Sequence, residues 1–162
     1  MEKYAVVVGS MNCDTIYLQK RLPEKGETFF ADSASVVPGG KGANQAVQIS
    51  KLGMKTYMIA KIGNDNYGSF LNGELERYGV KTDHVLCGKG TTGLAAVLTM
   101  PDGVYYSTVA PGTNYEVEVA EIEERRDLIA NASVAVFQSE ITHQATSGQG
   151  VFLLRQTAKR KR

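Results

Sequence analysis

The stretch from Pro38 to Ala46 reads Pro-Gly-Gly-Lys-Gly-Ala-Asn-Gln-Ala and constrains the fold more than any other part of this chain. Two consecutive glycines allow the backbone to approach a ligand with no Cβ atom in the way. A run of good helix formers begins at Ala43, so backbone N–H groups and the positive end of a helix are expected to face whatever lies above the loop. Lys41 adds a mobile cation, and Asn44 adds both donors and acceptors. Such a loop suits a small polyhydroxylated or phosphorylated ligand.

Two better-known glycine-rich loops do not match this stretch. A P-loop requires Ser or Thr directly after its Gly-Lys pair to hold Mg²⁺, whereas Lys41 is followed by Gly42. A dinucleotide-binding fingerprint requires Gly-x-Gly-x-x-Gly after a strand, and the spacing of Gly39, Gly40 and Gly42 is different. Taken alone, the loop could also be a tight strand-to-helix turn that binds nothing.

Further motifs flank the loop on both sides. Gly53 and Gly63 follow it, a Gly-Asn-Asp-Asn-Tyr-Gly block spans residues 63–68, and Gly-Ser-Met-Asn-Cys-Asp follows an apolar run at residues 9–14. Together these motifs resemble the ribokinase family of carbohydrate kinases, within the wider phosphofructokinase B superfamily. The resemblance runs from about residue 4 to residue 140. Fructokinases, adenosine kinases and ketodeoxygluconate kinases usually differ at residues 41–43, so the loop looks most similar to that of the ribokinases.

The composition is that of an ordinary globular protein. The chain has 162 residues, of which 43% are hydrophobic and 22% charged, and its net charge of +1 indicates neither a nucleic-acid nor a membrane partner. Cys13 and Cys87 are too few for a disulfide framework and are interpreted as free thiols in the cytoplasm. The apolar run at residues 4–8 is far too short for a signal segment or a membrane span, so it is interpreted as a buried strand.

Apolar runs alternate with helical patterns that end at glycines, which predicts βαβ units and an α/β fold. The resemblance implies a ribokinase-like, mainly parallel central sheet flanked by helices, with a small projecting β lid and with the C-terminal half of the fold missing. Residues 1–140 are expected to form the N-terminal, sugar-binding part, with lid strands near residues 13–37 and 92–110. Residues 141–162 are expected to be an atypical tail, disordered or non-native. The expected strands cover residues 4–9, 16–18, 28–37, 55–62, 83–86, 94–100, 104–109 and 134–138, and the expected helices cover 43–52, 66–78 and 119–130.

Polar residues at strand ends complete the predicted site. Carboxylates and amides there can hydrogen-bond sugar hydroxyls, and ligands of open α/β sheets bind beyond the carboxyl ends of the strands. The competing interpretation is that Asn12 and Asp14 form an Asx turn. In that case Lys41, Asn44 and Glu140 occupy ordinary surface or helix positions. The resemblance implies that the substrate is bound by Asn12, Asp14, Gly39, Gly40, Lys41, Asn44 and Glu140.

Four other residues have secondary or structural roles in this interpretation. Thr92, Gly93 and Asn114 match lid and substrate-side loops of the family and are secondary candidates for the site. Asp65 is expected to cap the helix that begins at residue 66. Neither histidine has a partner that suggests a catalytic triad or a metal site, and no metal ligand is assigned.

The chain has no counterpart of the block that the family uses for phosphoryl transfer, roughly Asp-Thr-x-Gly-Ala-Gly-Asp. No catalytic residue is therefore assigned, and the chain is about half as long as such enzymes. The resemblance implies ATP and Mg²⁺, with most of their binding residues absent here, and it also allows a monovalent cation. The irregular pattern after Glu140 favours a truncated or frame-shifted gene.

Two functions stay open at this point. The first is ATP-dependent phosphorylation of a pentose, D-ribose to ribose 5-phosphate, by the parent enzyme, with this chain inactive alone. The resemblance also implies a homodimer formed through the β lid. The second is a non-catalytic sugar- or nucleoside-binding or oligomerisation remnant, and another sugar kinase such as a fructokinase or a nucleoside kinase is a further alternative.

Overall fold

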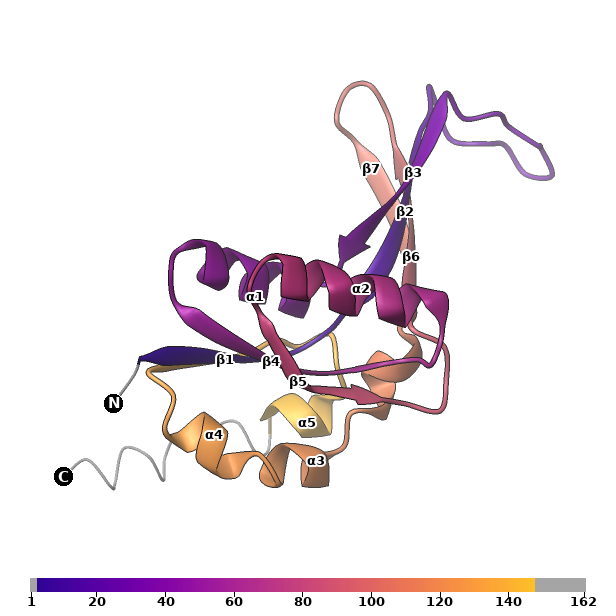
Figure 1. The fold of residues 1–162 in the computed structure, drawn as a ribbon. Coiled ribbons are helices and arrows are strands. Elements are labelled where there is room, and N and C mark those ends of the chain that lie inside the picture. The colour runs from indigo at the N-terminus through magenta and orange to yellow at the C-terminus, as the bar shows by residue number, and fades with distance from the viewer. Residues whose placement is uncertain (1–2, 148–162) are drawn as a thin grey trace.

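A parallel four-stranded sheet forms the body of the protein (Figure 1). The computed structural model describes residues 3–147, so the predictions for residues 148–162 lie outside the described residues. The strand order is β5-β4-β1-β8, and each neighbouring pair is parallel. The α/β fold with a parallel central sheet is therefore confirmed. The strands are β1 (Tyr4–Val8), β4 (Lys55–Ile62), β5 (Lys81–Cys87) and β8 (Val134–Phe137).

Helices cover both faces of this sheet, as Figure 1 shows. The long helices α1 (Lys41–Lys51) and α2 (Asn66–Arg77) lie on one face, and the short helices α3 (Val119–Glu123), α4 (Arg126–Ala130) and α5 (His143–Ser147) lie on the other. Each face has its own apolar cluster, to which β1 contributes alternate residues: Val7 to one cluster, Val6 and Val8 to the other. A strand covered on both sides must be apolar throughout, which explains its unbroken run of valines. None of the helices within residues 3–147 combines the length and hydropathy of a membrane span.

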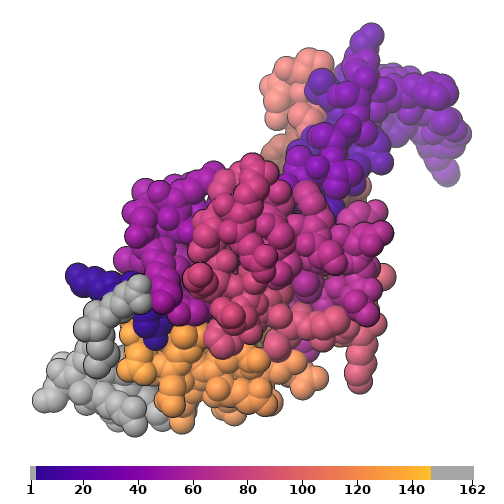
Figure 2. Space-filling model, in the orientation of Figure 1, coloured from indigo at the N-terminus to yellow at the C-terminus, as the bar shows by residue number. Residues whose placement is uncertain are grey.

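A second sheet projects from the body and is formed by strands near the residues expected for the lid. Figure 2 shows this sheet, here called the lid, as a narrow extension. Its strand order is β3-β2-β6-β7, in which only β2 and β6 are parallel. At the root of the lid, Asn12 pairs with Gly39 on one side and with Gly93 on the other. The glycine loop therefore leads directly from β3, which ends at Gly39, into α1, which begins at Lys41. The strands are β2 (Asn12–Leu18), β3 (Ser33–Gly39), β6 (Gly93–Thr99) and β7 (Tyr105–Ala110).

Several predicted boundaries differ from the structure. The strand expected at residues 28–37 begins only at Ser33, and β2 begins at Asn12 rather than at residue 16. The helix expected at residues 119–130 is two short helices, α3 and α4, and a 3₁₀ helix, η1 (Gly112–Glu116), precedes them. Both short helices still bury an isoleucine in one cluster, Ile122 and Ile129, so packing on the sheet has overridden continuous helix formation.

Residues 141–147, at the start of the tail predicted to be disordered or non-native, are ordered in the structure and include α5. Ile141 and Ala145 are 3% and 0% exposed and belong to the apolar cluster beneath the sheet. Ala145 lies on α5, and Ile141 lies just before this helix begins at His143. The division of the chain at residue 140 stays a prediction.

Candidate functional site

The first turn of α1 is capped by distant parts of the chain rather than by its own sequence. Its N-cap residue, Gly40, has a φ of 89° and no side chain to offer. The Lys41 N–H donates to Oε2 of Glu140 at 3.3 Å, and the Gly42 N–H donates to Oγ of Ser10 at 3.4 Å. The Ala43 N–H donates to the Ser10 carbonyl at 3.0 Å. The backbone groups predicted to face a ligand are thus met by protein groups, including a carboxylate that suits the positive helix end.

Glu140 is held by three hydrogen bonds at this helix end. Its Oε2 also accepts from the Ser10 hydroxyl at 2.8 Å, and its Oε1 forms an ion pair with the Lys41 ammonium. Burial raises the pKa of Glu140, but the hydrogen bonds from Lys41 and Ser10 outweigh burial and lower the pKa overall. Glu140 is therefore a carboxylate at neutral pH with a fixed orientation.

Asp14 lies against the glycine loop in a different electrostatic state. A Cβ atom added at Gly39 would lie 2.2 Å from Oδ2 of Asp14, so only glycine leaves room for this carboxylate. Oδ1 of Asp14 is buried and finds no hydrogen-bond partner among the residues that the structure describes. Burial raises the pKa of Asp14, the charge of Glu140 raises it further, and Lys41 opposes both. The unpaired acceptor and the proximity of both charged groups are typical of a ligand site.

Asn12 and Asn114 form a paired amide unit at the root of the lid. Asn114 Nδ2 donates to Oδ1 of Asn12 at 2.8 Å, and Asn114 also bonds both backbone groups of Met11. A Cβ atom at Gly93 would lie 2.2 Å from Oδ1 of Asn12, so this glycine makes room for the amide pair. The secondary candidates Gly93 and Asn114 therefore adjoin a primary one, and Asn114 fixes the orientation of Asn12.

A cavity of about 230 Å³ between the sheet and the lid joins Asn12, Asn114 and Glu140. It lies at the carboxyl ends of β1 and β8, because Asn12 and Glu140 follow these strands. The lid side is contributed by the end of β7 and the turn into η1. Its size suits a molecule smaller than a typical drug-sized ligand. The cavity is lined by Asn12, Val109, Pro111, Asn114, Tyr115, Ser139 and Glu140.

Three of the ten predicted site residues line this cavity, and the other seven do not. Of those seven, five adjoin its lining residues or the glycine loop: Asp14, Gly39, Gly40, Lys41 and Gly93. The remaining two lie elsewhere. Asn44 is exposed and lines a separate hollow of about 190 Å³ that includes residues of α1 and α2. Thr92 is buried and hydrogen-bonds Asp65, with its N–H at 2.8 Å and its hydroxyl at 2.7 Å from the two carboxylate oxygens. Asp65 also accepts from the Gly68 N–H at 2.8 Å, which confirms its predicted role as the cap of α2. Thr92 and Asp65 therefore join the lid to the body.

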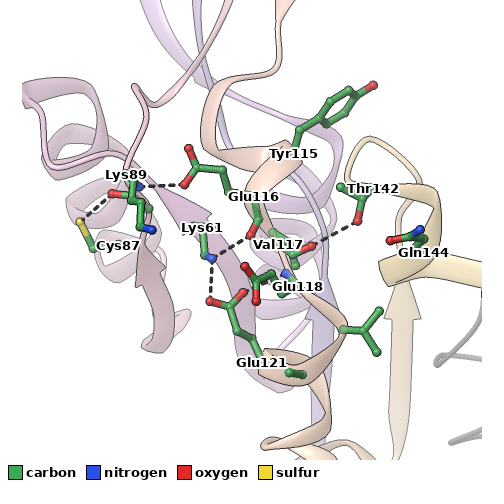
Figure 3. A pocket seen from close by; sticks show the side chains of 13 residues that line it. Lys61, Cys87, Lys89, Tyr115, Glu116, Val117, Glu118, Glu121, Thr142 and Gln144 are labelled. Carbon is green, nitrogen blue, oxygen red and sulfur yellow. Dashed lines mark hydrogen bonds and ion pairs between the residues drawn. The ribbon is translucent and has the colours of Figure 1, made fainter.

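A larger hollow of about 830 Å³ contains none of the predicted site residues. Figure 3 shows Lys61 at its wall, pointing to the Glu116 backbone and the Glu121 carboxylate. The Lys61 ammonium donates to the Glu116 carbonyl at 2.8 Å and pairs with Glu121 at 2.6 Å. This buried charge is already compensated by Glu121, so Lys61 is not free to bind an anionic ligand in this hollow.

Ser10 and Gln138 are site residues that the sequence interpretation missed. Both are buried, and the Ser10 N–H and hydroxyl lie 3.4 and 3.1 Å from Oε1 of Gln138. The only signal in the sequence was a polar residue directly beyond each of two apolar strands. Val109 and Pro111 carried no signal at all, since they reach the cavity only through the packing of the lid.

Comparison with known proteins agrees with this geometry. The model of the pfkB family of carbohydrate kinases matches residues 2–162. The chain belongs to the pfkB family. The matched range shows that the family pattern extends past residue 140, where the sequence had been interpreted as irregular.

Several pfkB-family relatives are ribokinases. The ribokinase of Bacillus subtilis strain 168 is 32% identical over 138 residues, which cover 85% of this chain and 47% of the relative. The ribokinase of Mus musculus is 32% identical over 142 residues, covering 87% and 44%. The Arabidopsis thaliana ribokinase, solved in complex with ribose and ATP, matches with a TM-score of 0.86 at 30% identity, covering 98% of this chain and 52% of that one. The chain spans about half the length of the relatives it matches.

Proposed function

We propose that this chain forms the sugar-binding part of a ribokinase-type enzyme that transfers the γ-phosphate of ATP to D-ribose, giving ribose 5-phosphate. The observation that carries the proposal is the cavity under the lid, where Asn12, Asn114 and Glu140 converge from distant parts of the chain. The ribokinase relatives and the ribose complex of the Arabidopsis protein support the choice of sugar.

Each polar group has a distinct role in the proposed site. The carboxylates of Asp14 and Glu140 accept hydrogen bonds from sugar hydroxyls, which are charge-assisted and therefore strong. Oδ1 of Asn12 is occupied by Asn114, so Asn12 offers the donor end of its amide. Lys41 is exposed and can donate to the sugar while it pairs with Glu140. Gly39 and Gly40 let the sugar approach the backbone. Asn44 lines a separate hollow, so its side chain would reach the sugar only from there.

ATP is the proposed phosphate donor of the whole enzyme, supported by the complexes of ribokinases with ATP and with ADP. The chain lacks a counterpart of the family's phosphoryl-transfer block, and residues 3–147 contain no group of three or more His, Cys, Asp or Glu side chains placed to hold a metal ion. Phosphoryl transfer depends on positioning and on stabilisation of charge around the nucleotide. It is therefore proposed for the whole enzyme rather than for this chain alone, and Mg²⁺ and a monovalent cation stay implications of the resemblance.

We also propose that the lid mediates a homodimer in the cytoplasm. Large hydrophobic side chains are exposed on its outer strands, including Val36 at 54%, Tyr105 at 65% and Tyr106 at 52%. Grouped apolar side chains on one projecting sheet are typical of an interaction surface. Sedimentation velocity should show a dimer that Tyr105→Lys converts to a monomer, and an unchanged dimer would contradict the lid interface. Both cysteines are unpaired, which fits a reducing compartment and can be checked by cell fractionation.

The proposed function is tested by titrating the 162-residue chain with D-ribose and following amide chemical shifts. We expect saturable shifts at Asn12, Asp14 and Glu140, and weaker shifts with 2-deoxy-D-ribose and D-fructose. The same chain with ATP and Mg²⁺ should not phosphorylate ribose above background. No ribose-dependent shift would refute the sugar site, and robust turnover would show that the chain carries a nucleotide site. Binding of a nucleoside in preference to ribose would favour the nucleoside-binding alternative.

A further inference from the structure

Ser10 is completely buried at the point where three segments of the chain meet. It follows β1, and its hydroxyl contacts Glu140 and Gln138 beyond β8 and Gly42 in the first turn of α1. Its carbonyl accepts from a further N–H of the same turn. One small side chain therefore links the cap of α1 to the carboxylate of the proposed sugar site.

The hydrogen-bond capacity of a hydroxyl decides how these contacts are shared. A serine hydroxyl has one proton and two acceptor lone pairs. The proton faces the Glu140 carboxylate at 2.8 Å and the Gln138 amide oxygen at 3.1 Å, and the shorter, charged acceptor is favoured. The Gly42 N–H occupies an acceptor position on the same oxygen. Ser10 thus donates to Glu140 while the first turn of α1 holds its oxygen in place.

The backbone around Ser10 is tightly packed. A Cβ atom at Gly42 would lie 2.6 Å from the Ser10 nitrogen, and a Cβ atom at Gly9 would lie 2.9 Å from both Gln138 Cβ and Gly42 Cα. Such distances are essentially never seen for real Cβ atoms, so the three backbones are as close as glycine allows. Rigid supporting hydrogen bonds of this kind hold a binding group in its productive orientation.

We infer that Ser10 is a positioning residue for sugar binding, which orients Glu140 and so sets the affinity of the site without touching the sugar itself. This inference rests on the proposed function. It adds a residue to the site that neither the glycine loop nor the sequence resemblance assigned.

The test compares Ser10→Ala with a matched control, Ser50→Ala. Ser50 on α1 also donates one hydrogen bond, to the Tyr78 carbonyl at 2.7 Å, but lies outside the site. Ser10→Ala should weaken ribose binding by about threefold to tenfold. This is the effect expected when one hydrogen bond to a charged group is lost and that group, Glu140, is the one that contacts the sugar. Ser50→Ala should leave ribose affinity unchanged even if it lowers the melting temperature by a similar amount.

A second readout needs no ligand. The charged groups that act on Glu140 are Lys41 and Asp14, and both are retained in the variant. Loss of the Ser10 hydrogen bond should therefore raise the pKa of Glu140 toward its ordinary value, measured by carboxyl-carbon NMR titration. As the pH falls, ribose binding by the variant should then be lost at a higher pH than in the wild type. An alanine variant with unchanged affinity and unchanged Glu140 pKa would overturn the inference.

Two further arms keep the outcomes separate. If Ser10→Ala fails to fold, Ser10→Cys takes its place, because its thiol retains a weak donor. The pKa of Glu140 should then be higher in Ser10→Cys than in the wild type, and an unchanged pKa would count against the inference. If the wild type binds no ribose, the proposed function fails. The NMR titration without ligand would still decide whether Ser10 orients Glu140.

Discussion

Replacing Gly40 with alanine is expected to lower the free energy of unfolding by about 3–5 kcal/mol, from backbone strain and overpacking together. Gly40 has a φ of 89°, a conformation that side chains rarely adopt. A Cβ atom there would also lie 2.7 Å from the Asn12 nitrogen and 2.8 Å from the Ser10 carbonyl oxygen. These neighbours are backbone atoms beside the site, so they cannot rotate away.

The matched control is Gly73→Ala in α2. Apart from its chain neighbours and the adjacent backbone of α2, no atom of the described residues lies within 4 Å of a Cβ atom built at Gly73. Alanine is also the better helix former, so this variant should gain about 0.5–1 kcal/mol. Urea denaturation measures both variants. A Gly40→Ala chain as stable as the wild type would show that the loop can relax, and that its glycines are not required for the fold.

Asp14→Ala should weaken ribose binding by about 1.5–3 kcal/mol, the range for a hydrogen bond to a charged group, without lowering stability. Its Oδ1 atom is buried without a hydrogen-bond partner in the part of the chain that the structure describes, and its pKa is raised by burial and by Glu140. At neutral pH the carboxylate therefore destabilises the ligand-free protein. Loss of binding combined with unchanged or increased stability is typical of a residue retained for function.

The pH dependence of stability provides a second check on Asp14. Because its pKa in the folded state is raised, Asp14 contributes stability below its unfolded pKa of about 3.9, and this contribution is lost as the pH rises through the folded pKa. The stability advantage of Asp14→Ala should therefore appear above the folded pKa and disappear at lower pH. Asp83→Ala, which removes an exposed aspartate on β5, should change neither ribose affinity nor stability at neutral pH. A large loss of stability in Asp14→Ala would identify Asp14 as a structural residue instead.

The central elements could be predicted because their determinants are local. An unbroken apolar run identified β1, and glycines with positive φ stopped α1 and α2 near the expected positions, at Gly53 and Gly79. The glycine loop and the α2 cap at Asp65 were also readable from short motifs. In each case the residues that decide the structure lie within a few positions of one another.

The errors arose where packing rather than local propensity decided. Residues 141–147 fall in the tail predicted to be disordered or non-native, yet Ile141 and Ala145 are buried against the sheet. A single helix was predicted at residues 119–130, and the structure has two. Neither feature has a marker in the neighbouring sequence, because the apolar surface that these residues cover is built by β1 and β4 more than 50 residues earlier.

For the site, the sequence alone determined which groups are available: two carboxylates, a lysine, two amides and a pair of glycines without side chains. Only the tertiary structure decided how they are connected. It brought Glu140 and Ser10 into hydrogen-bond contact with the first turn of α1 and paired Asn12 with Asn114 across 102 positions. It also placed Asn44 beside another hollow. The physical reason is that parallel strands bring their carboxyl ends to one edge of the sheet, so donors and acceptors meet there regardless of their distance along the chain.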